Sequence, residues 1–234
     1  MPSSVIDVYS RLSCYKPFCT ELLLTFIHRR QMNVLAARDA IFSELHSTVL
    51  KPLGFRKKGH WSILNEMPSF RTVYLRASRW SSAEEATFWI DVQVFRSDWF
   101  SLLWEPKAFP GPSEGTPSLV SEELNKMLSP QVQSLKIDAT TDIDGLTAAL
   151  SAGMRTHAWP LLQQCSSLEG ILSYYQSRNL NDDALSAAAV CVLLGREEQA
   201  KQFMKVAKEA APHENYLRWL EIREKAMWAN AAMQ

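Results

Sequence analysis

The sequence predicts an α+β fold: an antiparallel sheet of four to five strands flanked by helices, with an all-helical C-terminal part. Apolar and polar residues alternate over 70–80 (FRTVYLRASRW) and 86–95 (ATFWIDVQVF), the period of a strand with one buried face. The neighbouring connections NEMPS and SSAEE have hairpin length, so adjacent strands should be antiparallel. From residue 142 onward, apolar residues recur at helical spacing instead.

The first expected element is a helix over 33–50, where apolar residues recur at helical spacing. Pro52 and Gly54 follow it, and both residue types end helices. The run FRKKGHWSIL at 55–64 then predicts the first strand of the sheet. The run WFSLLWE at 99–105 predicts a fourth strand after the two alternating ones.

The segment 106–118 is rich in proline and glycine, which predicts a mobile loop that leaves the core. A short helix is expected over 118–128, with Ser118 as its cap and two glutamates in its first turn. The run VQSLKIDA at 132–139 predicts an edge strand. The remaining helices are expected over 142–165, 167–179, 182–195, 196–212 and 214–233.

The chain divides into three expected segments. Residues 1–31 show no sustained helical or strand period, whereas an amphipathic helix begins directly after Met32. The codons of residues 29–31 can form a purine-rich run that resembles a bacterial ribosome-binding site. We therefore expect Met32 to be the native start and the prefix to be non-native or disordered, with a loosely packed N-terminal arm as the alternative. Residues 32–141 should form the helix and sheet, and 142–234 a helical part packed on the same domain.

Composition favours a globular protein with its own core, since 234 residues can bury enough apolar surface without a disulfide or a metal. The 25 basic and 25 acidic side chains cancel, so no global field attracts nucleic acid or membranes. Four scattered cysteines, at 14, 19, 165 and 191, match no zinc or dithiol spacing and are typical of a reducing cytoplasm. The apolar run 20–27 is too short to span a membrane and lacks the flanks of a signal peptide.

Catalytic motifs are missing from the sequence. It contains no P-loop, dinucleotide-binding glycine pattern, nucleophile elbow or His-Glu-x-x-His helix. This favours a binding protein with no catalytic residues, metal or cofactor, and leaves an enzyme with dispersed catalytic residues, a hydrolase or a nucleic-acid-processing enzyme, as the alternative. The acidic residues Asp138, Asp142 and Asp144 are explained by capping of a helix, with a divalent cation as the second interpretation.

Candidate partner-binding residues lie on the two alternating runs. If these runs pair as a hairpin, Tyr74 and Arg76 lie beside Trp89, Asp91 and Gln93, and Arg76 opposite Asp91 would form a cross-strand ion pair. Tryptophan, tyrosine and arginine often anchor protein interfaces, so this face is a candidate recognition surface. Alternatively, the C-terminal helices cover it, and its polar groups are buried and satisfied there.

Further candidates lie at the ends of the expected strands. Arg56, Lys57 and Lys58 occupy the solvated start of the first strand and are rim candidates for an acidic protein partner. Nucleic-acid binding is disfavoured, because the balanced charge predicts no basic stripe that continues from them. Most tryptophans should pack in the core, but Trp80 and Trp99 near strand ends are candidates for exposed anchors.

The segment 181–212 is similar to the second half of a tetratricopeptide repeat. Leu194-Gly195-Arg196, Glu198 and Ala200, with Phe203, Ala207 and Pro212, carry this likeness. Ala184 stands where a large aromatic residue is expected. Because a repeat array needs roughly three or more units and only one is visible, we expect a single helical hairpin packed on its neighbours. An adaptor that uses this hairpin is a third functional option.

Three short stretches resemble a bacterial family catalogued as domain of unknown function four-three-zero-four. They are Leu53-Gly54-Phe55 with Lys57-Lys58-Gly59, the strand centre Val92-Gln93, and the helix from Asp144 to Leu162. The similarity covers about residues 32–175 and leaves out the N-terminal prefix.

The resemblance implies an α+β domain without established catalytic residues. It also implies that the chain could be an immunity protein, because small cytoplasmic proteins of this sort are often encoded beside bacterial toxin genes and cover the toxin's active site. In that case the partner is a cognate toxin, and specificity comes from interface shape and charge.

Overall fold

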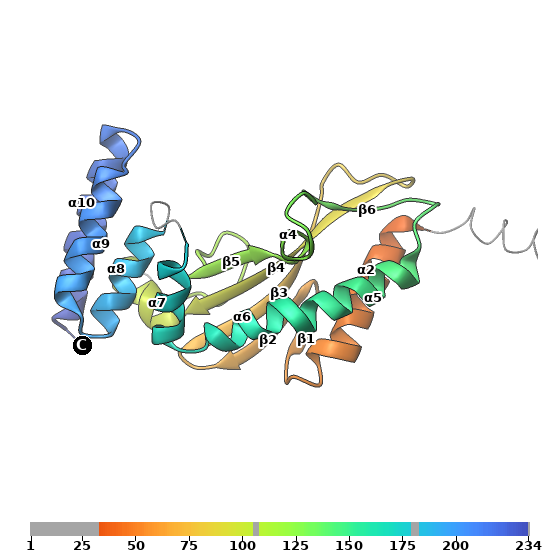
Figure 1. Cartoon of the computed structure of the whole chain (residues 1–234), viewed down its shortest axis with the longest axis horizontal. Helices are drawn as coiled ribbons and strands as arrows, with labels where there is room; N and C mark the ends of the chain where they lie inside the picture. Colours follow the sequence, from red (N-terminus) through yellow and green to blue (C-terminus); the bar gives the residue numbers. More distant parts are fainter. Residues whose placement is uncertain (1–32, 105–107, 179–182, 234) are drawn as a thin grey trace, which may run out of the picture.

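The computed structural model describes residues 33–104, 108–178 and 183–233 of the chain. Two expectations, that residues 1–31 form an extension and that Met32 is the native start, concern residues that lie outside these described ranges. The described part has the predicted α+β fold, with one antiparallel sheet, helices packed on it and a group of helices at the C-terminal end (Figure 1). Among the described residues, no helix combines the length and apolar character needed to cross a membrane.

The sheet has six antiparallel strands. They follow the order β1-β2-β3-β4-β5, and β6 also pairs with β4. β5 and β6 lie along different parts of the same edge of β4, next to Asp91–Val94 and Ala86–Phe88 respectively. The strands are β1 (Arg56–Lys58), β2 (Trp61–Glu66), β3 (Ser69–Ala77), β4 (Ala86–Arg96), β5 (Val120–Glu123) and β6 (Leu135–Ile137).

The single strand expected over 55–64 is wrong, because the structure divides it into the hairpin β1–β2. Gly59 makes the turn with a φ of 60°, in the left-handed region where a side chain is strained. Lys58 then pairs with Trp61 across a connection of two residues. A glycine next to a polar residue between two β-type runs is a hairpin signal, and the expectation of one continuous strand overlooks it.

The fourth strand expected over 99–105 is also wrong. These residues belong to helix α3 (Ser97–Trp104), in which Trp99, Phe100, Leu102 and Leu103 are buried. Their spacing of three and four residues places them on one helical face, and a short apolar run does not distinguish this arrangement from a strand.

The helix expected over 118–128 is partly wrong, because its first half is strand β5. Glu122 and Glu123 lie opposite Val92 and Asp91 of β4, and the helix α4 (Leu124–Leu128) begins only after them. The edge strand expected over 132–139 is confirmed as β6, with its leucine and isoleucine on the buried side.

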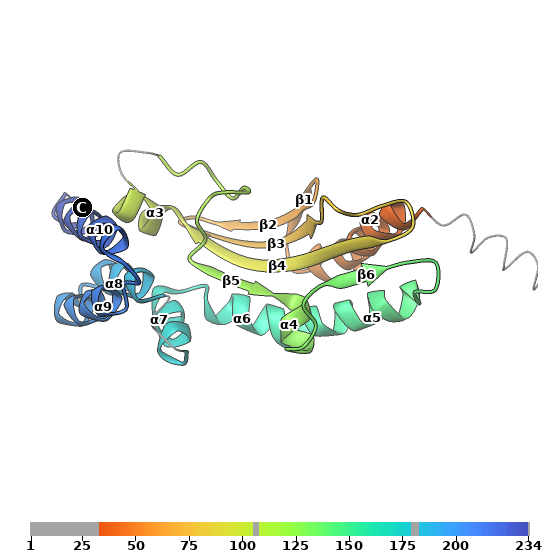
Figure 2. The same cartoon turned by 90° about the horizontal axis from the view of Figure 1, so that it is seen from above.

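Two helices cover one face of the sheet. The first is α2 (Val34–Leu45), which continues through a wider last turn, η1 (His46–Leu50). The second is a continuous helix made of α5 (Ile143–Gly153), η2 (Met154–Ala158) and α6 (Trp159–Gln164). Figure 2 shows α5 and α6 along one side of the sheet and the segment 108–119 on the other.

The face under these helices, here called the covered face, carries the centre of the core. Val73 lies opposite Val92 and Leu75 opposite Ile90, and all four side chains are fully buried. The intervening residues of the same strands, among them Tyr74 and Asp91, point to the opposite side, here called the open face.

The C-terminal helices are α7 (Leu168–Gln176), α8 (Ala184–Leu193), α9 (Glu197–Glu209) and α10 (Glu214–Ala231). α8 and α9 pack together across a turn at Gly195, whose φ is 70°. α10 is fixed to α3 by Asn230, which donates to two α3 carbonyls at 3.0 and 3.2 Å. The likeness of this hairpin to a tetratricopeptide repeat stays a prediction.

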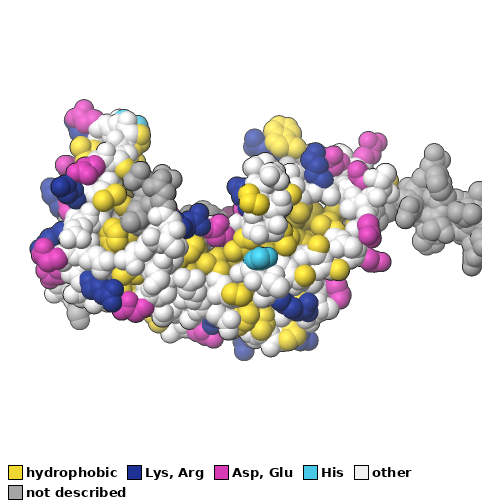
Figure 3. Space-filling model, in the orientation of Figure 1, with side chains coloured by type: hydrophobic (Ala, Val, Ile, Leu, Met, Phe, Trp, Pro, Cys, Tyr) yellow, Lys and Arg dark blue, Asp and Glu magenta, His cyan; other side chains and the backbone are white. Residues whose placement is uncertain are grey.

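The loop that the sequence predicts over 106–118 does not leave the core in its described part. Phe109 packs against Phe70, Phe95 and Phe100, with ring centroids 5.2 to 6.5 Å apart. The segment 108–119 therefore lies across part of the open face, where it bounds a hollow. In the space-filling view, a hollow also separates the C-terminal helices from the part of the molecule around α4 (Figure 3).

Candidate functional site

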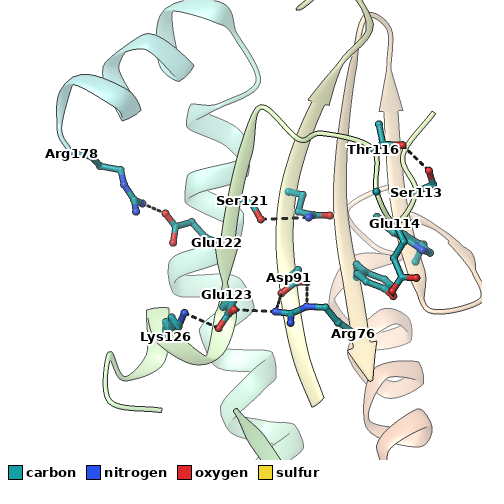
Figure 4. Close-up of a pocket in the computed structure, with 14 residues that line it drawn as sticks. Arg76, Asp91, Ser113, Glu114, Thr116, Ser121, Glu122, Glu123, Lys126 and Arg178 are labelled. Atoms are coloured by element: carbon teal, nitrogen blue, oxygen red, sulfur yellow. Dashed lines mark hydrogen bonds and ion pairs between the residues drawn. The ribbon is translucent and has the colours of Figure 1, made fainter. Parts of the chain in front are cut away.

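A cavity of about 570 Å³ lies on the open face. Its floor is formed by β2, β3 and β4, one wall by residues 113–116, and the other by β5, the start of α4 and Arg178 (Figure 4). Residues that are far apart in the sequence therefore meet above the sheet.

The predicted ion pair on this floor is confirmed. Arg76 Nε donates to Asp91 Oδ2 at 2.7 Å, and Arg76 Nη2 to Oδ1 at 3.1 Å. The two residues are diagonal neighbours, because the register places Arg76 opposite Trp89 and Asp91 opposite Tyr74. The expectation that Arg76 lies directly opposite Asp91 is therefore wrong, although the long arginine side chain still reaches the carboxylate.

This ion pair continues into a network. Arg76 Nη2 also donates to Glu123 Oε1 at 3.0 Å, and Lys126 Nζ lies 3.2 Å from the other oxygen of Glu123. The hydrogen bond to Asp91, and further the charges of Asp91 and Glu123, raise the pKa of Arg76. The charges of β3, β4 and β5 thus hold each other in place.

Tyr74 connects the floor to the loop above it. Its ring stacks on Trp61 with centroids 4.1 Å apart and planes 14° apart, and its hydroxyl donates to Glu114. Burial raises the pKa of Tyr74 well above its usual range, and the bond to Glu114 adds to this effect. Tyr74 is therefore a protonated hydrogen-bond donor that fixes the loop.

Trp89 and Gln93 complete the central part of the open face. Trp89 Nε1 donates to the carbonyl of Gln133 at 2.7 Å, while the Arg76 guanidinium lies 4.5 Å from its ring centroid. Gln93 Nε2 donates to Ser121 Oγ at 3.4 Å. Five of the residues proposed from the sequence thus lie together, namely Tyr74, Arg76, Trp89, Asp91 and Gln93.

The two remaining tryptophan candidates have opposite environments. Trp80, just after β3, is 81% exposed, and the Arg79 guanidinium lies 4.9 Å from its ring. Trp99 is only 3% exposed, so its assignment as a surface anchor is wrong. The helix α3 turns Trp99 into the core, whereas the expectation assumed the end of a strand.

The three cations of β1 do not form one cluster. Lys57 lies beside α2, where its ammonium donates to Ser43 at 2.7 Å and lies 5.6 Å from the Phe42 ring. Arg56 and Lys58 point to the open-face side, because strand residues alternate between faces. All three are exposed, and none lines the cavity.

The alternative that C-terminal helices cover this face is half right. The helices α5 and α6 cover the opposite face. Nevertheless, Tyr74 and Asp91 are only 8% and 6% exposed, and their polar groups are satisfied. The cover over them comes from the 113–116 loop and neighbouring side chains.

Sequence reasoning missed the residues that surround the floor. Glu114 reaches Tyr74 from 40 positions away, and Glu123 reaches Arg76 from 47 positions away. Glu122 pairs with Arg178, which follows α7. No periodicity or short motif connects positions so far apart, so only the fold brings them together.

The acidic residues after β6 act as local caps. Asp142 accepts from the amide of Gly145 at the start of α5. Asp138 accepts from Thr140 and Thr141, and these bonds lower its pKa. No group of three or more His, Cys, Asp or Glu side chains in the described residues could hold a metal ion.

The two described cysteines are poor nucleophiles. Cys165 and Cys191 are buried free thiols, and burial raises the pKa of Cys165 to about 12. Burial likewise raises the pKa of Cys191 to about 11. Both are therefore protonated at neutral pH, and thiols in that state react slowly.

Comparison with known proteins identifies the family. The sequence model of one protein family, described as domain of unknown function DUF4304, matches residues 46–164, just over half of the chain. The match covers all six strands and ends with α6, so it is shorter than the similarity expected over 32–175. Searches of the curated proteins and of the solved structures found no significant match. The chain therefore belongs to the DUF4304 family.

Proposed function

We propose that this chain is a non-catalytic protein-binding protein that holds its partner on the open face and on the adjoining β3–β4 connection. The observation that carries the proposal is the combination of a preorganised polar floor with Trp80, which is 81% exposed in the connection between the floor strands β3 and β4. A tryptophan that exposed gains much from burial in a partner, and tryptophan and arginine are the residues that most often dominate interface energetics.

The open face supports binding because its side chains are already fixed. Arg76 is held by Asp91 and Glu123 and also stacks on Trp89. A partner that docks there orders few side chains, which lowers the entropic cost of association. The paired charges can still direct hydrogen bonds to complementary groups at the rim.

An enzymatic role receives less support from the same geometry. A catalytic acid or base works best with a pKa near the working pH, whereas burial moves the pKa of Tyr74 away from it. Three of the four cavity acids, Asp91, Glu122 and Glu123, are engaged by basic side chains, and the fourth, Glu114, accepts from the Tyr74 hydroxyl. These groups are arranged to maintain a shape.

The specific form of the proposal is an immunity protein that neutralises a cognate bacterial toxin in the cytoplasm. Such a protein needs no chemistry of its own, since covering the toxin's active site is sufficient. A sheet face with fixed charges and aromatic rings offers the shape and charge specificity that this task needs.

The test is co-expression with the product of the gene that neighbours this one. We expect the two proteins to co-purify, and expression of this chain to restore growth that the neighbouring product inhibits. A neighbouring product that neither binds the chain nor harms growth would contradict the immunity role.

Two matched variants locate the interface in this experiment. Trp80→Ala removes the exposed anchor, and Ile222→Ala removes an apolar side chain on α10 that is 63% exposed. We expect Trp80→Ala to weaken co-purification and growth rescue, with no effect of Ile222→Ala. The reverse pattern would place the partner on the C-terminal helices.

A further inference from the structure

A second cavity, of about 480 Å³, lies on the other side of the 114–116 loop. Phe100 and Trp104 of α3 line it, together with Pro110, Pro117 and Arg223 of α10. The proposed protein interface does not use this cavity. Its volume is typical of a small-molecule site, and half of its lining residues are aromatic residues or prolines.

Arg223 is the charged residue of α10 in this cavity, and it is half-buried. Its guanidinium lies 4.1 Å from the Trp104 ring centroid and 5.4 Å from that of Trp219. Nη1 donates to the carbonyl of Leu103 at 2.8 Å, in the last turn of α3. These contacts fix the side chain, but they supply no negative charge.

Arg223 lacks a carboxylate partner, unlike the other arginines that are buried or half-buried in the described parts of the chain. Those four each form an ion pair with a carboxylate; they are Arg38, Arg71, Arg76 and Arg96. Arg223 has no such pair among the described residues, and burial lowers its pKa. A guanidinium removed from water without a counter-ion is costly.

Two buried donors beside the cavity also have no hydrogen-bond acceptor in the described structure. They are Nε of Arg223 and Nε1 of Trp104. A buried N–H group without an acceptor loses its hydration without compensation. The end of α3 and the facing turn of α10 therefore have a surplus of hydrogen-bond donors, and the Arg223 charge there is not paired with a carboxylate of the described residues.

We infer that this cavity binds a small carboxylate with a flat apolar body. The carboxylate meets the Arg223 guanidinium, whose planar fork matches its two oxygens, and the apolar body packs on Phe100 and the prolines. The two unpaired N–H groups are covered in this structure, so the carboxylate reaches them only after a side-chain rotation. This site joins α3, inside the DUF4304 match, to α10 outside it.

Glu114 also lines this cavity and opposes an anion there. Its carboxylate accepts from the Tyr74 hydroxyl, which belongs to the neighbouring cavity on the open face. Its charge should nevertheless weaken carboxylate binding. Glu114→Gln is therefore expected to tighten binding, an effect opposite in sign to that of removing Arg223.

The test uses the full chain and the probe pair phenylacetate and phenylacetamide, which have the same shape and differ in charge. Binding is followed by NMR at the indole N–H of Trp104, assigned with Trp104→Phe. We expect phenylacetate to shift this signal saturably and to bind at least about tenfold more tightly than phenylacetamide, because charge-assisted hydrogen bonds are stronger. Equal affinity for the two probes, or no shift with either, would overturn the inference.

The matched variants are Arg223→Gln and Arg218→Gln on the same helix. Arg218 is exposed and pairs with Glu214, so its loss should leave phenylacetate affinity unchanged. Arg223→Gln should weaken it at least about tenfold. If Arg223→Gln does not fold, the comparison of the two probes on the unmodified chain still decides the matter. The probe experiment involves no protein partner, so its result tests the carboxylate site independently of the proposed function.

Discussion

The covered and open faces are built from the same two strands and differ in how they are stabilised. On the covered face, Val73, Leu75, Ile90 and Val92 are fully buried against helices. On the open face, the intervening positions carry aromatic and charged residues that hydrogen-bond and stack on each other. The alternation of apolar and polar residues along β3 and β4 therefore has two consequences. Apolar burial on one face stabilises the fold, and the polar network on the other sets the shape of a surface.

This difference predicts that stability and binding can be changed separately. Substitutions on the covered face should mainly lower the free energy of unfolding, because they remove buried apolar contacts. Substitutions at the exposed edge of the open face should mainly change affinity for a partner. The following four measurements test this separation, in order of decreasing expected effect on stability.

Leu75→Ala should have the largest effect. Leu75 of β3 is fully buried on the covered face, opposite Ile90 of β4, so its truncation leaves a cavity in the core. We expect a loss of about 3 kcal/mol in the free energy of unfolding, measured by urea denaturation. A loss below about 1 kcal/mol would mean that the covered face is loosely packed.

The Arg76–Asp91 pair should have an intermediate effect, measured by a double-mutant cycle with alanine at each position. The Asp91 side chain is only 9% exposed, so the coupling should reach about 1 kcal/mol. The control is the same cycle on the exposed pair Arg218–Glu214, for which we expect less than about 0.5 kcal/mol. Equal couplings would show that the open-face network adds no rigidity.

Tyr74→Phe should have an effect that depends on pH. Burial raises the pKa of Tyr74 in the folded state above its unfolded value of about 10, so its contribution to stability is present below that pH and is lost above it. The free energy of unfolding of the unmodified chain should therefore fall as pH rises above about 10. In Tyr74→Phe this alkaline fall should be shallower, and an identical slope would contradict the burial of the hydroxyl.

Trp80→Ala should have the smallest effect on stability. The side chain touches little besides Arg79, so the free energy of unfolding should change by less than about 0.5 kcal/mol. Urea denaturation checks this directly. A larger loss would show that Trp80 supports the fold rather than a partner.

The sequence predicted the parts of the fold that depend on local patterns. The alternation of β3 and β4 revealed both faces, and the Arg76–Asp91 pair followed from it. The same approach failed where a short run fits two structures, as at Trp99, whose neighbours have the spacing of a helix. It also failed at Gly59, where one glycine divides an expected strand into a hairpin.

The rest of the site could not be predicted, because its contacts depend on how the chain returns to the sheet. Glu114 lies in a loop that folds back over Tyr74, and Glu123 is brought beside Arg76 by β5. Arg223 meets Trp104 only because α10 packs on α3, and the two residues are more than half the chain apart. None of these pairs has a local signature.

The central claim is tested most directly by measuring partner affinity and stability on the same two variants. Calorimetry with the neighbouring gene product should show that Trp80→Ala weakens binding at least about thirtyfold while stability is retained. The folded fraction of Leu75→Ala should bind as tightly as the unmodified chain despite its lower stability. If Trp80→Ala binds with unchanged affinity, the open face and its edge are not the partner-binding surface.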